Sequence, residues 1–386
     1  MKATSPTTPA HSPSGWRQIG SGALPVGAAL LVVVLALLCL AAGPPVIVSG
    51  HSDFPLRVSG GQIAAMVAEQ QGPAVQASSA ALVDRASNAT LFAKNGTMPL
   101  PMASTTKLMT VLEALKSLSP DQVVGVPGAA LVGGASMGLS AGEQVDVLTL
   151  LYGALLPSGN DAATALALAA EGDEAGFVAR MNQQAAEWGL NQTHFANPTG
   201  FDAPGHASSA LDLAALGRRA LANPLIASIV GQPTAQVGGY TLQNTNELLG
   251  VYDGAYGVKT GTTDAAGQVL IAAAKRPSGD ALAVVMNSPD RYAEAGRLLD
   301  FYFGHWLWRD VGLGHDVLNR ITAPDGAVYM LRTPAQPLFL TRWQASQLRM
   351  VRQVSFDEAN QPSGVLRVWL GEEKLIETGI EFMRVK

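Results

Sequence analysis

The sequence predicts a mixed α/β (α+β) domain that is followed by a small β domain. Residues 77–117 show the pattern strand, strand, helix, and the same pattern appears again after residue 259. From about Leu313 the chain changes to short β-like runs that are separated by Pro and Gly turns. This change predicts a separate domain, and a length of 386 residues has room for roughly two or three domains.

An apolar run at residues 23–42 precedes the predicted domains and is about as long as a helix that crosses a bilayer. Lys2 and Arg17 lie before the run, whereas the next Lys or Arg after it is Arg57. The positive-inside rule therefore predicts a cytoplasmic tail at 1–22 and an extracytoplasmic position for the rest of the chain. We expect the run to be kept as a membrane anchor; if it were cleaved as a signal, the protein would be secreted.

The remaining elements are predicted in chain order. Several Pro and Gly residues make 43–70 a linker, the main domain is expected over 71–312, and the small β domain over 313–386. Strands are predicted at 77–84, 88–96, 268–274, 281–287, 328–332, 348–356 and 365–370. Helices are predicted at 104–117, 145–156, 161–170 and 293–302.

The composition argues against several classes of site. Charged residues make up only 14% of the chain, the net charge is −5, and Lys and Arg form no cluster, so nucleic acid is not expected as a partner. The single cysteine, Cys39, permits neither an intramolecular disulfide nor a Cys-based zinc site. The six histidines show no HExxH or paired-ligand spacing, so we expect neither a metal nor a cofactor.

A candidate nucleophile and base lie at the start of the first predicted helix. Ser104 and Lys107 are three residues apart, which places both side chains on one face of the helix. A serine hydroxyl is a weak nucleophile, and a lysine amine accepts its proton only when burial or a second cation lowers the lysine pKa. Lys259 is the candidate second cation. Taken alone, the spacing also fits a capped helix with a solvated lysine.

Two further short motifs supply polar groups for a substrate. Ser158 and Asn160 belong to a Ser-Gly-Asn sequence in the break between two predicted helices, where a serine can relay a proton and an asparagine can hold an amide. Lys259, Thr260 and Gly261 form a Lys-Thr-Gly sequence at the start of a predicted strand, whose backbone could pair with an extended peptide. The two polar side chains could bind a carboxylate, and the glycine would let the substrate come close.

The three motifs lie within longer blocks that resemble one family. These blocks are 101–110 (PMASTTKLMT), 155–163 (LLPSGNDAA), 181–202, 244–249 (NTNELL) and 257–263 (GVKTGTT). In them the sequence is similar to the penicillin-binding proteins and β-lactamases, and among these to the low-molecular-weight D-alanyl-D-alanine carboxypeptidases of the S11 peptidase family. The resemblance implies a penicillin-binding-protein/β-lactamase-like fold, in which helices cover an antiparallel sheet and a helical subdomain is attached.

The resemblance also implies the chemistry. Ser104 would be the acyl-ester nucleophile, Lys107 its proton acceptor, and Ser158 with Asn160 the pair that relays a proton and positions the substrate. The implied reaction removes the last D-Ala from a peptidoglycan stem pentapeptide through a serine ester, which water then hydrolyses without metal or cofactor. β-Lactam antibiotics would be inhibitors that occupy the same serine.

The remaining family motif implies how the substrate is held. Lys259 and Thr260 would bind the terminal D-Ala carboxylate, and Gly261 would let the peptide approach. The backbone N–H groups of Ser104 and Thr262 would form the oxyanion hole, which stabilises charge that develops only in the tetrahedral intermediate.

Three alternatives stay open. Residues 134–138 match the GxSxG nucleophile elbow of triad esterases, with Ser136 as nucleophile, although the flanking glycines do not fit a strand-to-helix turn. Residues 187–191 match the ExxxN pattern that carries the deacylating glutamate of class A β-lactamases, although Gly189 fits the C-terminus of a surface helix. The third alternative is a non-catalytic cell-wall-binding protein with an inactive site.

Overall fold

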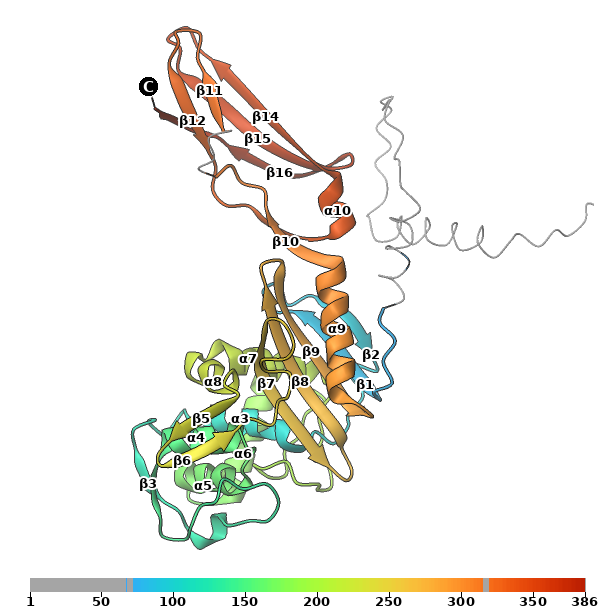
Figure 1. Cartoon of the computed structure of the whole chain (residues 1–386), viewed down its shortest axis with the longest axis vertical. Helices are drawn as coiled ribbons and strands as arrows, with labels where there is room; N and C mark the ends of the chain where they lie inside the picture. Colours follow the sequence, from blue (N-terminus) through green and yellow to red (C-terminus); the bar gives the residue numbers. More distant parts are fainter. Residues whose placement is uncertain (1–66, 68–71, 315–318, 386) are drawn as a thin grey trace, which may run out of the picture. The chain divides into compact units, whose positions relative to one another are not determined.

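The computed structural model describes residues 67, 72–314 and 319–385 (Figure 1). The predicted cytoplasmic tail, the apolar run at 23–42 and the predicted linker, apart from residue 67, lie outside the described residues. Within the described part of the chain, no single helix is long and apolar enough to cross a membrane. One pair of helices meets the length and composition criteria only together, α7 (Ala210–Ala222) and α8 (Pro224–Val230), with a bend of 106° between them.

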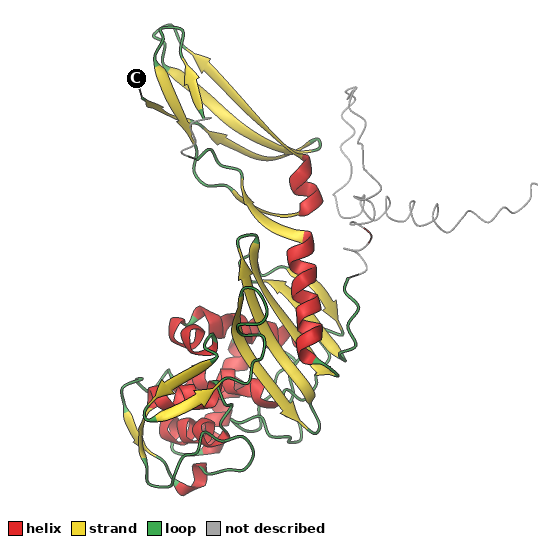
Figure 2. Cartoon of the chain, in the orientation of Figure 1, coloured by secondary structure: helices red, strands yellow, loops and turns green. Residues whose placement is uncertain are grey.

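The main domain is built on a five-stranded antiparallel sheet, drawn in yellow in Figure 2. Its strands are β1 (Ser79–Asp84), β2 (Thr90–Lys94), β7 (Ala255–Thr263), β8 (Gly267–Arg276) and β9 (Gly279–Ser288). The spatial order is β2-β1-β9-β8-β7, so β7 forms one edge of the sheet. In the β7–β8 register Lys259 lies opposite Ile271. The sheet thus joins strands from the beginning and the end of the domain.

Alternating side chains of β8 enter hydrophobic cores on opposite faces of the sheet. Val269 and Ile271 belong to one core, and Leu270 and Ala272 belong to the other. Helix α9 (Arg291–His305) covers the face of Leu270, and α7 covers the opposite face (Figure 1). Because both faces are buried, the strand is apolar along most of its length, which explains why it could be predicted from the sequence.

A mainly helical part shares the core on the α7 face of the sheet. Its helices are α3 (Lys107–Ala114), α4 (Val147–Leu155), α5 (Asn160–Glu171) and α6 (Glu174–Glu187). Two hairpins accompany them, β3 (Val123–Gly125) with β4 (Gln144–Asp146) and β5 (Thr234–Val237) with β6 (Tyr240–Gln243). This part corresponds to the predicted helical subdomain. Its helices and the sheet share one hydrophobic core, which holds the first residues of α3 and α5 close to the sheet.

Most predicted elements of the main domain are confirmed with shifted ends. The largest difference is at the predicted helix 104–117, which begins as a 3-10 turn, η1 (Ala103–Thr106), and continues as α3 only to Ala114. The Lys-Thr-Gly motif lies in the middle of β7 rather than at the start of a strand. The break between the helices at 145–156 and 161–170 is confirmed, since α4 ends at Leu155 and α5 begins at Asn160.

The C-terminal residues form small antiparallel sheets around their own core. Their strands are β10 (Trp306–Asp310), β11 (Arg320–Thr322), β12 (Val328–Arg332), β13 (Pro337–Thr341), β14 (Leu348–Phe356), β15 (Pro362–Leu370), β16 (Glu373–Gly379) and β17 (Glu381–Arg384), with a short helix α10 (Arg342–Gln347). Leu331, Leu366 and Val368 are fully or almost fully buried in this core. The predicted strands 328–332 and 348–356 are confirmed with the same ends. Strand β10 precedes the predicted boundary at 313 and pairs with β13 beyond it.

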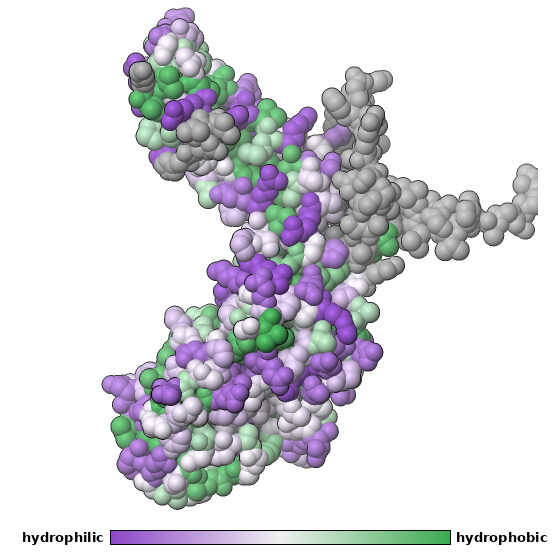
Figure 3. Space-filling view, in the orientation of Figure 1, coloured by the Kyte–Doolittle hydropathy of each residue, from purple (hydrophilic) through white to green (hydrophobic). Residues whose placement is uncertain are grey.

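Exposed apolar side chains are scattered rather than gathered. Figure 3 shows hydrophilic and hydrophobic residues interspersed on the face that it presents. Among the described residues, Val251 is 82% exposed, and Phe201, Met350 and Met383 are about half as exposed, each on a different element or loop. Single exposed apolar residues are normal on a protein surface and indicate no docking site by themselves.

Candidate active site

The candidate nucleophile lies in η1, which leads directly into α3. Ser104 is half-buried in this turn, and Lys107, the first residue of α3, is 0% exposed. The Lys107 ammonium donates a hydrogen bond of 2.8 Å to Ser104 Oγ. The expected contact between the two side chains is therefore confirmed, because a three-residue spacing places them on one side of the turn.

Lys107 has two further acceptors within the protein. Its Nζ donates to Asn160 Oδ1 at 2.7 Å and to the backbone oxygen of Thr199 at 2.6 Å. Burial lowers the pKa of Lys107 well below its usual range, and the charge of Lys259 lowers it further. A neutral Lys107 amine would keep its N–H bonds to Asn160 and Thr199 and direct its lone pair toward Ser104. The arrangement can therefore take a proton from the serine hydroxyl.

The break between α4 and α5 directs Ser158 and Asn160 toward the same point. Ser158 has a φ of +66°, a left-handed conformation that residues with a Cβ seldom adopt. The backbone N–H of Asn160 donates to Ala135 O at 2.7 Å, and its side-chain Nδ2 donates to Gly133 O at 2.8 Å. These bonds turn the Asn160 amide oxygen toward Lys107. Asn160 thus holds the candidate base as well as the loop beside it.

Lys259 reaches the site from β7 and is only 1% exposed. Its ammonium donates to Ser158 Oγ at 2.9 Å and to the backbone oxygen of Thr260 at 3.1 Å. Burial, and then the nearby charge of Arg291, lower the pKa of Lys259 to about 7. Ser158 and Lys259 therefore form a second hydroxyl–amine pair beside Ser104 and Lys107, and this pair can exchange a proton near neutral pH.

Gly261 brings the edge strand against the nucleophile turn. A Cβ on Gly261 would lie 2.9 Å from the Cβ of Ala103 and 3.1 Å from the backbone nitrogen of Ser104. Only a residue without a side chain permits this approach. The close packing places Gly261, the residue before Thr262, beside the Ser104 nitrogen; the oxyanion hole of Ser104 and Thr262 stays a prediction.

The other predicted substrate-binding side chains lie along the same strand. Thr260 is buried, and its hydroxyl shares a hydrogen bond of 2.5 Å with the hydroxyl of Thr245. Arg291 Nη1 donates to the Thr262 hydroxyl at 2.7 Å and to the Gly261 oxygen at 3.0 Å. Arg291 brings a positive charge to this edge that was not among the predicted site residues.

Asp161 is a second residue that the sequence analysis did not assign. Its buried carboxylate accepts hydrogen bonds from the Ser136 hydroxyl at 2.5 Å and from the N–H groups of Met137, Gly138 and Leu139. Burial would raise the pKa of Asp161, but these hydrogen bonds outweigh it and lower the pKa. Asp161 therefore anchors the loop that Asn160 contacts. In the sequence, Asp161 could have been recognised as a site residue because it directly follows the Ser-Gly-Asn motif.

The same contacts contradict the esterase alternative. Ser136 lies in a loop with neither a strand immediately before it nor a helix immediately after it, whereas a nucleophile elbow requires both. Its hydroxyl is engaged by Asp161 and by the N–H of Gly138. Ser136 thus serves to shape a loop.

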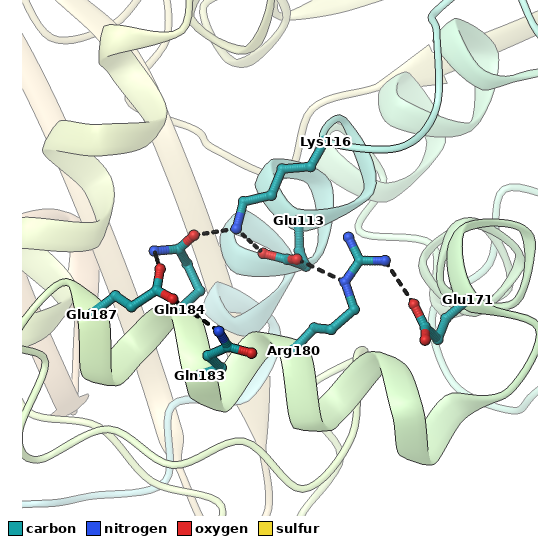
Figure 4. A network of polar contacts seen from close by, with 7 residues as sticks. All are labelled: Glu113, Lys116, Glu171, Arg180, Gln183, Gln184 and Glu187. Atoms are coloured by element: carbon teal, nitrogen blue, oxygen red, sulfur yellow. Dashed lines mark hydrogen bonds and ion pairs between the residues drawn. The ribbon is translucent and has the colours of Figure 1, made fainter.

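The glutamate of the β-lactamase alternative lies in a surface network (Figure 4). Glu187 is exposed at the end of α6, and its carboxylate accepts hydrogen bonds of 3.0 Å from the amides of Gln183 and Gln184. Helix α6 ends there, and Gly189 has a φ of +70°, as expected for a helix C-terminus. These contacts give Glu187 a structural setting that differs from the cluster around Ser104.

The groups gathered around Ser104 are hydroxyls, amines and amides. Over residues 72–314 and 319–385, no group of three or more His, Cys, Asp or Glu side chains is arranged to hold a metal ion. The hydroxyls and amines around Ser104 offer nucleophilic attack with proton transfer between them.

Comparison with known proteins agrees with this geometry. The family model described as D-alanyl-D-alanine carboxypeptidase, peptidase S11, matches residues 65–290. The chain belongs to this family. Within the family it is similar to the D-alanyl-D-alanine carboxypeptidase DacF of Bacillus subtilis, with 37% identity over 293 residues that cover 72% of this chain and 75% of the relative. DacB2 of Mycobacterium tuberculosis is 36% identical over 58% of this chain and 80% of its own length.

Solved structures of similar proteins have the same fold. Penicillin-binding protein 6B of Escherichia coli aligns with a TM-score of 0.64 and 28% identity, over 81% of this chain and 96% of that one. A D-alanyl-D-alanine carboxypeptidase of Mycobacterium tuberculosis aligns with a TM-score of 0.56 and 34% identity, over 60% of this chain and 92% of that one. The predicted penicillin-binding-protein-like fold is confirmed.

Proposed function

We propose that this chain is a serine-type D-alanyl-D-alanine carboxypeptidase that removes the terminal D-Ala of peptidoglycan stem peptides through an ester on Ser104. The observation that carries the proposal is the pairing of two hydroxyls with two buried amines. Lys107 contacts Ser104 at 2.8 Å, and Lys259 contacts Ser158 at 2.9 Å. Membership of a family described by this activity supports the choice of substrate.

In the first step, Ser104 Oγ attacks the carbonyl carbon of the penultimate D-Ala, and the hydroxyl proton passes to Lys107. The carbonyl oxygen becomes an oxyanion that accepts hydrogen bonds from the N–H groups of Ser104 and Thr262. Burial of Lys107 supports its role as the base, because an amine in water would be protonated and unable to accept the proton.

In the second step, the carbon–nitrogen bond breaks, and the amine of the departing D-Ala takes a proton from Ser158. Lys259 restores that proton, which its contact with the Ser158 hydroxyl permits. The terminal carboxylate would be held by Thr260 together with the positive charges of Lys259 and Arg291, since all three lie on one edge of the site. Water then attacks the ester and gives a proton, through Ser158, to the neutral Lys259 amine, while Lys107 returns its proton to Ser104 and the shortened peptide is released.

The test uses two substrates on the purified full-length chain. Labelled penicillin should form a long-lived adduct whose mass maps to the peptide that contains Ser104, and a peptide ending in D-Ala-D-Ala should release D-Ala. Ser104→Ala should abolish both reactions, while Ser136→Ala should retain them. An unlabelled Ser104 together with no D-Ala release would overturn the proposal.

The same experiment separates the carboxypeptidase from a β-lactamase. A carboxypeptidase should hold the penicilloyl ester for much longer than its acylation takes, and Glu187→Gln should change neither rate. Rapid penicillin turnover that Glu187→Gln abolishes would instead identify a β-lactamase.

We further propose that the chain acts outside the cytoplasm and that residues 23–42 anchor it to the membrane. Support comes from the apolar run itself and from the basic residues that precede it. The expected result is that the full-length chain sediments with membranes and is released by detergent, whereas a chain that begins at residue 43 stays in the supernatant. Recovery of the full-length chain without residues 1–42 would show that the run is a cleaved signal.

A further inference from the structure

The residue before the candidate nucleophile has an unfavourable backbone conformation. Ala103 has a φ of +48°, in the left-handed region where a residue with a Cβ costs on the order of 1 kcal/mol or more. Such a conformation persists only when surrounding contacts determine it. Because Ala103 directly precedes Ser104, whatever holds Ala103 also sets the direction of the Ser104 side chain.

Two glycines enclose Ala103 but cannot orient it alone. A Cβ on Gly200 would overlap the Ala103 carbonyl group, and Gly261 packs against the Ala103 Cβ from β7. These contacts are steric, so they limit the space without supplying a directional bond. The directional contact comes from Thr106, whose hydroxyl donates to the Ala103 oxygen at 2.8 Å.

The Thr106 hydroxyl connects this carbonyl to a buried histidine. Thr106 Oγ1 lies 2.8 Å from His206 Nε2, and the opposite ring nitrogen, Nδ1, accepts the backbone N–H of Ala196 at 2.9 Å. Because Nδ1 is an acceptor, the ring proton of the neutral histidine is on Nε2. The hydroxyl has one proton, which it gives to Ala103, so it accepts from His206. All the hydrogen bonds therefore run in one direction, from Ala196 through His206 and Thr106 to Ala103.

We propose that His206 is a positioning residue for the nucleophile, which acts through the Thr106 hydroxyl to fix the Ala103 carbonyl and thereby the turn that presents Ser104. The proposal rests on the proposed function, since it concerns the rate at which Ser104 is acylated. His206 contacts neither substrate nor reacting atoms in this scheme. Its contribution is to keep an unfavourable turn in one conformation, because a misplaced nucleophile reacts slowly.

The surroundings of His206 keep its ring neutral. The side chain is 4% exposed, and the Phe195 ring meets it edge-on at 6.1 Å between centroids. Burial lowers the pKa of His206 to about 4, the neighbouring His194 and Lys107 lower it as well, and Asp202 opposes them. A protonated ring would also direct an N–H at the Ala196 N–H. The neutral form is thus the one that fits the hydrogen-bond chain.

Two conservative variants of His206 separate its two hydrogen bonds. A glutamine amide reaches the place of Nε2, so His206→Gln keeps the donor to Thr106 and loses the acceptor for Ala196. An asparagine reaches only the place of Nδ1, so His206→Asn keeps the acceptor and loses the donor. Each variant loses one bond, and we expect similar decreases in melting temperature. The exposed neighbour His194 gives a matched control, His194→Gln.

The measurements are the acylation rate with labelled penicillin and kcat and KM for D-Ala release. We expect His206→Asn to slow acylation about 10- to 100-fold and to lower kcat with little change in KM, as a misplaced nucleophile does. His206→Gln and His194→Gln should stay within about threefold of the unmodified chain. Equal acylation rates for the Asn and Gln variants, compared at equal folded fractions, would overturn the proposal.

A second pair of variants applies if His206→Asn does not fold. Thr106→Val removes the hydroxyl and keeps the shape, whereas Thr106→Ser restores the hydroxyl. The valine variant should acylate about 10- to 100-fold more slowly and the serine variant at close to the original rate; a valine variant with the original rate would contradict the proposal. Failure of the unmodified chain to form any Ser104 adduct would contradict the proposed function itself, so the two failures are distinguishable.

Discussion

The two ends of helix α3 carry lysines in opposite settings. At its start, Lys107 is 0% exposed and donates hydrogen bonds to a hydroxyl, an amide oxygen and a backbone carbonyl oxygen. Just beyond its end, the Lys116 side chain is 44% exposed and forms an ion pair of 2.7 Å with Glu113 (Figure 4). Lys116 thus reaches solvent and has a carboxylate partner. Burial against neutral partners makes the other lysine a candidate base.

The comparison shows that residue type alone does not decide the chemistry of a lysine. Both lysines lie within ten residues of one another, and both donate hydrogen bonds to side chains of other helices. The difference lies in solvent and in the charge of the acceptor. Burial, and then the charge of another cation, Lys259, lower the pKa of Lys107. Lys116 instead pairs with the carboxylate of Glu113.

The largest effect is expected from removing the amine of Lys107, and the matched removal of the Lys116 amine is the control. Lys107→Met should slow acylation of Ser104 by about 10²- to 10⁴-fold, because the serine loses its proton acceptor. Lys116→Met should leave the rate within about twofold, since Lys116 contacts Glu113 and Gln184 and not the groups around Ser104. The rates are measured with labelled penicillin under single-turnover conditions. A similar decrease in the acylation rate in both variants would contradict the role of Lys107 as the proton acceptor.

Acid should weaken the Lys107 end of α3 through His206. In the unfolded chain a histidine titrates near 6.5, whereas burial holds the pKa of His206 at about 4 in the fold. Between these values the unfolded chain binds a proton that the folded chain does not, so this contribution is complete above pH 6.5 and is lost toward pH 4. The loss is on the order of 3 kcal/mol of the free energy of unfolding.

Thermal or urea unfolding at pH 7 and at pH 4.5 measures this contribution, and His206→Gln provides the reference because glutamine does not titrate. The unmodified chain should lose more stability than the variant over that interval. Equal losses would show that His206 is not the group responsible, and would leave the carboxylates, such as Asp161, as the acid-sensitive sites.

A smaller effect is expected from the residue that directs Lys107. Asn160→Ala removes the amide oxygen that Lys107 contacts and the Nδ2 bond to Gly133. We expect acylation to fall about 10- to 100-fold, because the amine is no longer held toward Ser104. Asn160→Asp should shift the pH profile of acylation to higher pH, because a carboxylate beside Lys107 would raise the pKa of the lysine. An unchanged profile would show that the amide does not control the charge of Lys107.

The smallest effect is expected in the surface network. Glu113→Gln removes the charge that pairs with both Lys116 and Arg180. The two partners of Glu113 reach solvent while its carboxylate is buried, so we expect a loss at the upper end of the range for solvent-accessible pairs, about 1 kcal/mol in the free energy of unfolding. Urea unfolding gives the value, and the acylation rate should not change. A slower acylation would reveal coupling along α3 between its two ends.

The local structure around the motif residues could be predicted from the sequence, because the motifs lie in or beside elements with a clear pattern. Ser104 and Lys107 have helical spacing, and the strands after Lys259 are continuous apolar runs that are buried on both faces. The meeting of the three motifs could only be inferred from the family resemblance, because contacts across the fold depend on packing and not on local periodicity.

Other parts of the site left no local signal. The φ of Ala103 depends on Gly200 and Gly261, which are distant in the sequence, and nothing in the residues next to Ala103 indicates it. His206 and Thr106 are 100 residues apart, so their contact could not be read from spacing. Helices α7 and α8 were not predicted either, and α8 is only seven residues long, which is too short for a periodic pattern to stand out.

The register of the edge strand β7 determines where Lys259 lies. Lys259 reaches Ser158 only in the register that places it opposite Ile271, and a slip of one residue would turn its side chain to the other face of the sheet. A molecule with a slipped edge would still be compact and would retain most of its secondary structure, yet it could not be labelled by penicillin. The labelled fraction of a preparation is therefore a direct assay of correct strand registration, which far-UV circular dichroism and size measurements do not detect.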